Sequence, residues 1–306
     1  MEKTIVVIGS SNTDMVGKSD KLPVPGETVL GGIFSINQGG KGANQAVAIA
    51  RMGGDVTFVS RIGNDSFGKD SLAMFDKENI NKDYIFLDPD LPSGIALIMV
   101  DENGENCIMV ASGANANLST YDIDKAREVI ENAEFLLLQL ETPIKTVEYA
   151  AKMASQKGIK VILNPAPAAF LSDELLKCLY AIIPNAIEAE ILSGIKITDW
   201  ESAQKAADLI SLKGVDIVII TMGSKGAFIK ERDLYFKLPV EKNNVIDTTA
   251  AGDTFCGAFC VGISEGVSIL DAAKMANFAA GISVTREGAQ SSIPYRNEIP
   301  FLNQNK

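Results

Sequence analysis

Short apolar runs alternate with amphipathic stretches along most of the chain. The apolar runs lack a polar face, which is typical of strands buried on both sides. The stretches between them repeat apolar residues every three or four positions, which predicts helices. We therefore expect an α/β fold, a three-layer α/β/α sandwich with a mostly parallel central sheet. The predicted strands are residues 4–8, 56–61, 135–140, 160–163, 181–183 and 216–221, and the predicted helices are 42–52, 66–79, 142–157 and 202–213.

Two regions interrupt this alternation. Residues 15–37 are rich in Gly and Pro, and residues 94–112 predict two strands, 95–100 and 107–110, joined by a turn that contains Asn103 and Gly104. Both faces of the first of these strands are apolar, so the hairpin needs a partner on each side. We expect a small β-sheet lid, formed by about residues 15–37 and 94–112, that covers a site and packs against another subunit. A hairpin packed only on the main body is the alternative.

The composition removes several classes of function. The 306 residues include 28 Lys and Arg, 39 Asp and Glu, and no His, for a formal charge of −11. Ser-His and Cys-His catalysis and His-ligated metals are excluded. The acidic balance argues against nucleic-acid binding, and no apolar run is long enough to cross a membrane. Without an export signal we expect a cytoplasmic protein with reduced thiols, of which Cys256 and Cys260 have the spacing of a buried helix face.

The strongest local signal is the string of small residues from Asp247 to Asp253, which leads directly into an apolar helical stretch. Unpaired backbone amides at the start of a helix form an anion site, and the helix dipole adds to it. Asp253 would lie beside the bound anion. A simple helix cap explains an isolated Asp there, but it does not explain the loss of side-chain packing at several adjacent positions.

A second glycine-rich string, residues 38–45, also runs into a predicted helix. It lacks the Ser or Thr that follows Lys in a Walker A loop, and the chain has no G-x-G-x-x-G fingerprint. Lys41 and Asn44 offer donors suited to sugar hydroxyls, although a structural helix entry is the alternative. Asn12 and Asp14, after the first predicted strand, have the side chains to pair with vicinal hydroxyls, although turn formers are also ordinary there.

Polar residues close several of the predicted central strands. Glu141 and Asn164 each follow one, and Asn185 with Glu188 follows another at a spacing of one helical turn, suited to a hydrated magnesium ion. The turn at residues 221–226 is suited to a nucleotide. Caps and surface turns are the alternative for all of these positions.

Taken in order, these strings resemble the ribokinase (PfkB) family of sugar kinases across nearly the whole chain. The Gly-Gly-Lys-Gly-Ala-Asn block at residues 39–44 and the Asp-Thr-Thr-Ala-Ala-Gly-Asp block at 247–253 carry the likeness. The second block, together with residues 9–14 and 25–28, is most similar to the branch that phosphorylates D-ribose at O5 with ATP. The resemblance implies a single α/β kinase domain over residues 1–306, a β-sheet lid that often forms a homodimer, Mg²⁺ with ATP, and K⁺ as an activating cation.

The resemblance also implies roles for individual residues. Asp253 matches the catalytic base, and the anion hole matches Ala250, Ala251 and Gly252. The positions that match the sugar site are Asn12, Asp14, Gly40, Lys41, Gly42, Ala43, Asn44, Glu141 and Asp253. Those that match nucleotide contacts are Asn185, Thr221, Met222, Gly223, Ser224, Lys225, Gly226, Gly252 and Asn277. The potassium positions are Asp247, Thr249, Ser283, Arg286, Gly288 and Ser292, largely through backbone oxygens, and Glu188 matches a magnesium contact through water.

A mechanism follows from these roles. Asp253, with an ordinary pKa near ~3.9, would be ionised at neutral pH and would accept the proton of the attacking hydroxyl. Backbone amides would hold the charge that develops on the transferred phosphoryl group. Two alternatives remain: a kinase for deoxyribose, fructose, 2-keto-3-deoxygluconate or a nucleoside such as adenosine, and a non-catalytic, sugar-responsive regulator with the same fold.

Overall fold

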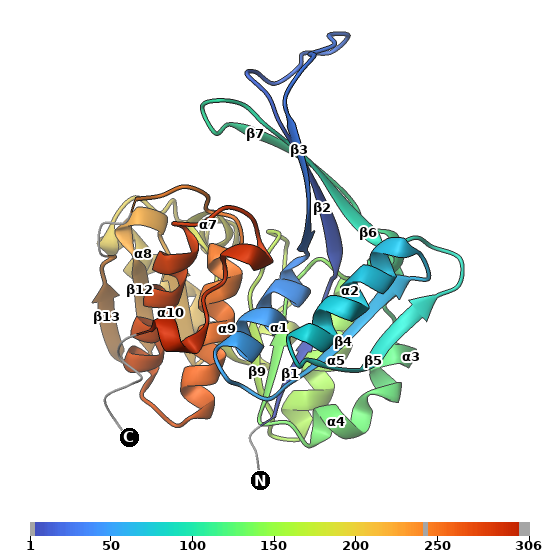
Figure 1. The fold of residues 1–306 in the computed structure, drawn as a ribbon. Coiled ribbons are helices and arrows are strands. Elements are labelled where there is room, and N and C mark those ends of the chain that lie inside the picture. The colour runs from blue at the N-terminus through green and yellow to red at the C-terminus, as the bar shows by residue number, and fades with distance from the viewer. Residues whose placement is uncertain (1–3, 241–243, 300–306) are drawn as a thin grey trace.

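The computed structural model describes residues 4–240 and 244–299, and a large twisted sheet lies at its centre (Figure 1). Its strands are β1 (Ile5–Ile8), β4 (Val56–Gly63), β5 (Asn81–Asp88), β8 (Phe135–Leu138), β9 (Lys160–Leu163), β10 (Leu179–Ile182), β11 (Ile217–Thr221), β12 (Ala227–Glu231) and β13 (Leu234–Leu238). Within the described residues they follow the order β13-β12-β11-β10-β9-β8-β1-β4-β5. All neighbours pair in parallel except β11–β12 and β12–β13, which are antiparallel. The predicted mostly parallel sheet is confirmed.

Both faces of this sheet are covered by helices. Ile5 and Val7 of β1 belong to one apolar cluster, whereas Val6 and Ile8 belong to the other, because successive side chains of a strand point to opposite faces. On the first face lie α1 (Lys41–Arg51), α2 (Ser66–Lys77), α9 (Ala251–Ser264) and α10 (Ile269–Ser283). On the second lie α3 (Thr120–Lys125), α4 (Arg127–Glu131), α5 (Ile144–Gln156), α6 (Asp173–Leu176), α7 (Ala186–Ser193) and α8 (Trp200–Ser211). The three-layer α/β/α architecture is therefore confirmed.

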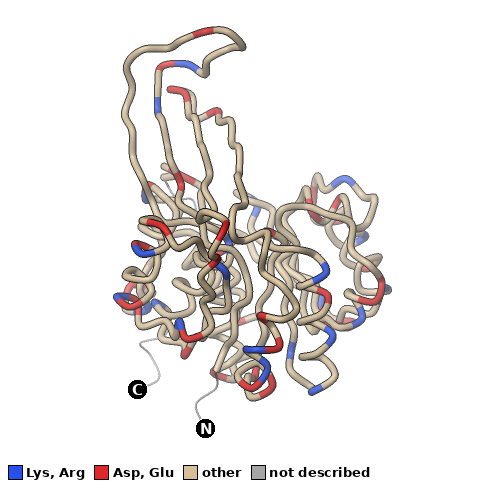
Figure 2. The backbone as a smooth tube through the Cα atoms, turned by 90° about the vertical axis from the view of Figure 1, so that its right-hand side faces the viewer, with Lys and Arg blue, Asp and Glu red and all other residues tan. Residues whose placement is uncertain are grey.

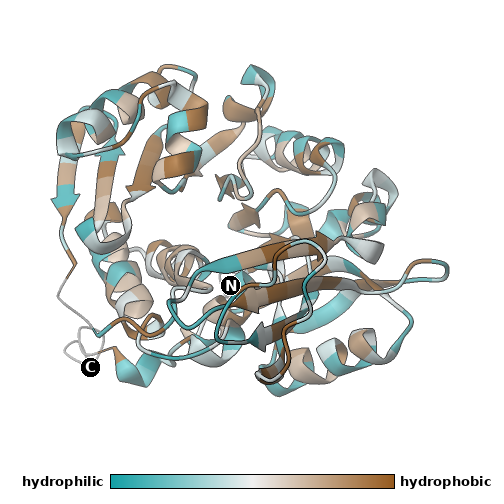
Figure 3. Cartoon of the chain, turned by 90° about the horizontal axis from the view of Figure 1, so that it is seen from above, coloured by the Kyte–Doolittle hydropathy of each residue, from teal (hydrophilic) through white to brown (hydrophobic). Residues whose placement is uncertain are grey.

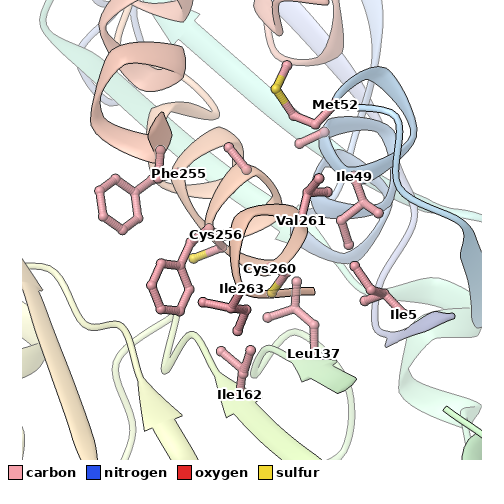
Figure 4. Packing of buried hydrophobic residues seen from close by; sticks show 14 of the residues in the cluster. Ile5, Ile49, Met52, Leu137, Ile162, Phe255, Cys256, Cys260, Val261 and Ile263 are labelled. Carbon is pink, nitrogen blue, oxygen red and sulfur yellow. The ribbon is translucent and has the colours of Figure 1, made fainter. Parts of the chain in front are cut away.

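Helix α9 is the most deeply buried helix of the first layer, and Figure 4 shows its side chains between the sheet and α1. Cys256 and Cys260 are fully buried in that apolar cluster, near Leu137 and Ile162. Among the described residues no three His, Cys, Asp or Glu side chains gather as a metal site. The two thiols therefore pack as small apolar groups, as their helical spacing predicts.

A second, smaller sheet projects from the body (Figure 1). This outer sheet contains β2 (Asn12–Lys18), β3 (Ile33–Gly39), β6 (Gly94–Val100) and β7 (Asn106–Ala111), in the order β3-β2-β6-β7. The predicted hairpin at 94–112 is present as the antiparallel pair β6–β7. The strands β2 and β3 were not predicted, because their mixed polar and apolar residues show no regular alternation and their pairing with each other and with β6 is non-local.

The outer sheet leaves the body beside β1, from which the later strands of the central sheet are added first on one side and then on the other. Strand β1 pairs with β4 on one side and with β8 on the other, and ligands of parallel α/β sheets bind at such a point, beyond the carboxyl ends of the strands. The start of α1 packs against this place. A Cβ on Gly42 would lie 2.6 Å from the backbone nitrogen of Ser10, so only glycine permits the approach.

Charged side chains lie mostly on the body, and Figure 2 shows Lys and Arg mixed with Asp and Glu there. The strands of the outer sheet, seen from above in Figure 3, are largely hydrophobic. Every helix in residues 4–240 and 244–299 is too short or too polar to cross a bilayer.

Candidate active site

Asp253 lies in the first turn of α9 and is almost completely buried, at 6% exposure. Two neighbouring amides of α1 donate to its two carboxylate oxygens. Asn44 Nδ2 lies 2.9 Å from Oδ2, and Gln45 Nε2 lies 2.9 Å from Oδ1. The glycine-rich string and the small-residue string of the sequence therefore meet at this carboxylate.

The chain enters α9 through an unusual backbone conformation. Ala250 has a φ of 59°, a left-handed conformation that costs an L-residue about 1 kcal/mol or more and is typical of functional sites. The amide of Ala251 donates to the Thr248 carbonyl at 3.3 Å, so it is less available than the sequence suggested. Gly252 borders open space, since a Cβ there would meet no atom within 4 Å. The start of α9 thus borders an open space, and the start of a helix favours an anion there.

The predicted sugar-binding pair, Asn12 and Asp14, lies on β2 rather than in a turn after β1. Two residues apart on a strand, they share one face. The Asn12 Oδ1 accepts a hydrogen bond of 2.7 Å from Asn115, which also bonds the backbone of Ser11. Asp14 packs over Gly39, where any Cβ would overlap its carboxylate. Asn115 therefore holds Asn12 in place before a ligand arrives, and Asp14 lies against the backbone of Gly39.

Glu141 and the start of α1 complete the same side of the site. The Glu141 Oε2 accepts hydrogen bonds from Ser10 Oγ at 2.6 Å and from the Lys41 amide at 3.0 Å. Gly40 caps α1 with a φ of 87°, which glycine adopts without strain. Gly42 and Ala43 pack behind it, and the Ala43 amide donates to the Ser10 carbonyl.

The charges of the site converge on one lysine. Burial lowers the pKa of Lys41, but the carboxylates of Asp253, Glu141 and Glu188 outweigh that effect and raise the pKa overall. Burial, with repulsion from Glu141 and Asp253, raises the pKa of Asp14 from 3.8 to about 7. With four carboxylates around one ammonium group, the site favours the binding of a cation.

The expectation of an ordinary pKa for Asp253 is wrong. Burial raises the pKa of this carboxyl, and repulsion from Glu141 acts in the same direction. Attraction by Lys41 and hydrogen bonds from Asn44 and Gln45 oppose the rise. The ionised form of Asp253 therefore depends on those three neighbours, because a charge taken out of water has to be compensated locally.

The predicted nucleotide contacts gather at the ends of β10 and β11. Asn185 and Thr221 form an isolated parallel bridge, and the Met222 amide donates 2.7 Å to the Gly226 carbonyl to close the turn. Gly226 lies against Leu238, and Asn277 on α10 donates to the adjacent Pro239 carbonyl. Gly223, Ser224 and Lys225 form a 3-10 turn, from which the Lys225 amine bonds the Thr198 carbonyl.

Asn185 and Glu188 form a reciprocal cap at the start of α7. The Asn185 Oδ1 accepts from the Glu188 amide at 2.9 Å, and both Glu188 oxygens accept from Asn185. The capping alternative is therefore present in the structure. Burial and the charge of Asp253 raise the pKa of Glu188, although the Asn185 amide and Lys41 oppose the rise. A buried carboxylate of this kind fits a hydrated divalent cation nearby.

Hydrogen bonds join three of the proposed cation positions, Asp247, Thr249 and Gly288, to one another. The Asp247 carboxylate accepts from the amide and hydroxyl of Thr249 and from the Gly288 amide, at 2.9, 2.6 and 3.0 Å. The other side chains have different partners: Ser283 donates to the Ala280 carbonyl, Ser292 to the Ala289 carbonyl, and Arg286 pairs with Glu298. Contributions from those three positions would come from backbone oxygens.

Several residues of the site were missed or given no role from the sequence. Asn115 follows the outer sheet, and no local motif marks it. Gln139 precedes Glu141 by two residues, and Gln45 ends the glycine-rich string, but neither position carries a recognisable signal. Their importance arises only from contacts between residues distant in the chain, such as Gln45 with Asp253.

The fold and the site together are those of a small-molecule kinase. The chain belongs to the pfkB family of carbohydrate kinases, whose family model matches residues 2–296. It is 46% identical to the ribokinase of Haemophilus influenzae, over 99% of both chains, and 38% identical to the deoxyribokinase of Salmonella typhi, over 95% of both. A solved structure of Arabidopsis thaliana ribokinase complexed with ribose and ATP superposes with a TM-score of 0.91 at 31% identity, covering 100% of both chains.

Replacement of Asp14 should alter the pH dependence of stability. With its pKa at about 7 in the folded chain, the native state binds the proton more tightly than the unfolded state, and wild type loses stability as pH rises toward 7. The free energy of unfolding of Asp14→Asn, measured with urea, should therefore rise relative to that of wild type between about pH 5 and about pH 8, by at most about 4 kcal/mol.

Asp88→Asn is the matched control. Burial opposes ionisation of Asp88, but hydrogen bonds from Leu91 and Asn117 and the charge of Arg61 lower its pKa to about 2. The change in the free energy of unfolding that Asp88→Asn causes should be the same at about pH 5 and at about pH 8. An Asp14→Asn difference that stays constant with pH would contradict the perturbed pKa.

Proposed function

We propose that the protein transfers the γ-phosphoryl group of ATP to O5 of D-ribose, yielding ribose 5-phosphate and ADP. The observation that carries this proposal is the buried Asp253, held by two amides at the open start of α9. The polar pair Asn12 and Asp14 supports a polyhydroxylated acceptor, and Asp14 interacts with the charges of Glu141, Asp253 and Lys41. The identity with the ribokinase of Haemophilus influenzae supports ribose as that acceptor.

Asp253 is the general base of the reaction. The O5–H proton passes to its carboxylate while the bond between O5 and the γ-phosphorus forms. The bond from that phosphorus to the bridging oxygen breaks, and its electron pair leaves on ADP. Asp253 then releases the proton to solvent. The amides at Ala250, Ala251 and Gly252 hold the charge that develops on the transferred group.

The sugar and nucleotide are held by separate groups. Asn12, Asp14 and Asn44 bind the sugar hydroxyls, and the buried Asn44 Oδ1, which has no hydrogen-bond partner among the described residues, is available for one of them. Lys41 balances the negative charge of sugar-site carboxylates and phosphate. The turn of residues 221–226, with Asn185 and Asn277, holds the nucleotide. Mg²⁺, held through water by Asn185 and Glu188, would neutralise phosphate charge.

The chain works as a single kinase domain in this proposal, and the outer sheet is its lid. The outer sheet begins at Asn12, so its position is coupled to sugar binding, and its closure would exclude water from the phosphoryl transfer. Its apolar residues are exposed on both faces, as in Phe34 at 64%, Ile108 at 58% and Met109 at 59%. Exposed apolar surface of this kind supports a homodimer formed through the lid.

A deoxyribose kinase is the second candidate, because the deoxyribokinase of Salmonella typhi is 38% identical over 95% of both chains. A coupled ADP-release assay over ribose, 2-deoxyribose, fructose, 2-keto-3-deoxygluconate and nucleosides separates the candidates. Ribose should give the highest kcat/KM. A higher value for 2-deoxyribose would replace the assignment.

Asp253→Asn should lose at least ~10²-fold in kcat, because the hydroxyl proton then has no acceptor. The KM values for ATP and ribose should change little, since the amide keeps the shape of the carboxyl. Asp199→Asn, which alters an exposed cap at the start of α8, is the control and should keep wild-type turnover. Near wild-type turnover of Asp253→Asn would remove Asp253 as the base.

Potassium should activate the enzyme through the loops that Asp247 joins. The Asp247 carboxylate, which accepts hydrogen bonds from the amides of Thr249 and Gly288, is a hard oxygen ligand of the kind that suits a monovalent cation. Turnover in potassium chloride should exceed turnover in tetramethylammonium chloride at equal ionic strength. Asp247→Ala should abolish the difference, and equal rates in the two salts would contradict the site.

The lid should form the dimer interface. Phe34→Asp places a charge on its exposed apolar face and should convert the dimer to a monomer, as measured by light scattering after size-exclusion chromatography. Leu212→Asp, at an even more exposed apolar position of the body, should leave the mass unchanged. A monomeric wild-type protein would contradict the proposed interface.

A further inference from the structure

Three buried amides form a hydrogen-bonded group that leads to Asp253. Gln45 and Gln139 are fully buried, and Asn164 is 7% exposed. Gln45 Nε2 donates to Asp253 Oδ1 at 2.9 Å and also to Asn164 Oδ1 at 3.1 Å. Gln139 Nε2 donates to Gln45 Oε1. We call Gln45, Gln139 and Asn164 the amide cluster.

The amide cluster has a defined direction of hydrogen bonding. The Ile183 backbone carbonyl can only accept, so it takes the Asn164 Nδ2 donor at 2.9 Å and leaves Asn164 Oδ1 facing Gln45. Gln139 donates to the Gln45 oxygen from the other side. The NH₂ end of Gln45 is therefore directed toward Asp253, because a flipped amide would bring its oxygen against two other acceptors.

The cluster also explains a glycine at the end of β1. A Cβ on Gly9 would overlap Gln139 Oε1, so a larger residue would displace Gln139. The arrangement is built from β1, α1 and the segments after β8 and β9. None of these side chains is among the predicted sugar or nucleotide positions, and each takes part in the contacts that lead to Asp253.

We propose that Gln45 is a positioning residue for phosphoryl transfer, which holds the Asp253 carboxylate in the orientation that accepts the sugar proton, while Asn164 and Gln139 hold Gln45. This proposal rests on the proposed function of Asp253 as the base. Asn44 holds the other carboxylate oxygen but is also a proposed sugar-binding residue. Of the two amides that donate to Asp253, Gln45 is therefore the one with no proposed contact to the sugar. A charge-assisted hydrogen bond in a buried site is worth more than an ordinary one.

The electrostatic surroundings make the role of Gln45 measurable. The groups that face Asp253 are Lys41 on α1, Glu141 after β8, Asp14 on β2, Glu188 on α7 and Cys256 on α9. Lys41 is the only cation in this set. Loss of the Gln45 donor therefore leaves less to oppose the burial of the carboxylate, and the base should take up a proton at higher pH than in wild type.

The test compares pH profiles of kcat for wild type and Gln45→Met, which has similar length but no donor. The ratio of variant to wild-type kcat should fall by about 10- to 100-fold at about pH 6, and it should recover as the pH rises to about 9. Thr57→Val removes another buried polar group, at the start of β4, and its ratio should not change with pH. A Gln45→Met ratio that is constant with pH would overturn the proposal.

Gln45→Asn covers the case in which Gln45→Met does not fold. It keeps an amide in the cluster, but its side chain is one methylene shorter, which draws the donor away from Asp253. The same pH-dependent ratio is expected, with a smaller amplitude, and a constant ratio would again overturn the proposal. Asp253→Asn distinguishes failure of the proposed base from failure of the proposed positioning residue. Wild-type turnover of Asp253→Asn would show that Asp253 is not the base. An inactive Asp253→Asn, together with a Gln45→Met ratio that is constant with pH, would leave Asp253 as the base and contradict only the role of Gln45.

Discussion

The burial of one carboxylate is the constraint on which the site depends. Asp253 lies at 6% exposure at the start of the most buried helix, and a charge in that place requires donors and a cation. Helix α1 supplies the two amide donors, and Lys41 at its first position supplies the charge. The two helices can approach so closely because Gly257 has no side chain: a Cβ there would lie 2.5 Å from the Cβ of Ala48.

The same constraint explains why the absence of histidine has no cost for the proposed chemistry. Phosphoryl transfer to a hydroxyl needs an anionic base, positive charge near the phosphates and water exclusion. Carboxylates, one lysine, backbone amides and cations provide these without an imidazole. The net charge of −11 is a property of the whole chain, whereas at the site Lys41 is the cation among the carboxylates of Asp253, Glu141 and Glu188.

Much of the body could be predicted because its determinants are local. A strand such as β9 is apolar on both faces, and helix α1 has a clear amphipathic period, so each is recognisable without its partners. The strands β2 and β3 were missed because their pairing is non-local and their residues are mixed. Asn12 and Asp14 were therefore expected directly after the first strand, although they lie on a second strand, β2, of the outer sheet.

By itself, the sequence determined the α/β/α architecture, the glycine-rich start of α1 and the small-residue start of α9 with its aspartate, since composition and short-range periodicity carry that information. Only the tertiary structure decided that Gln45 and Asn44 bond the two oxygens of Asp253, that Asn115 holds Asn12, and that burial raises the pKa of the base. The physical reason is that desolvation and hydrogen-bond geometry depend on which distant residues are neighbours.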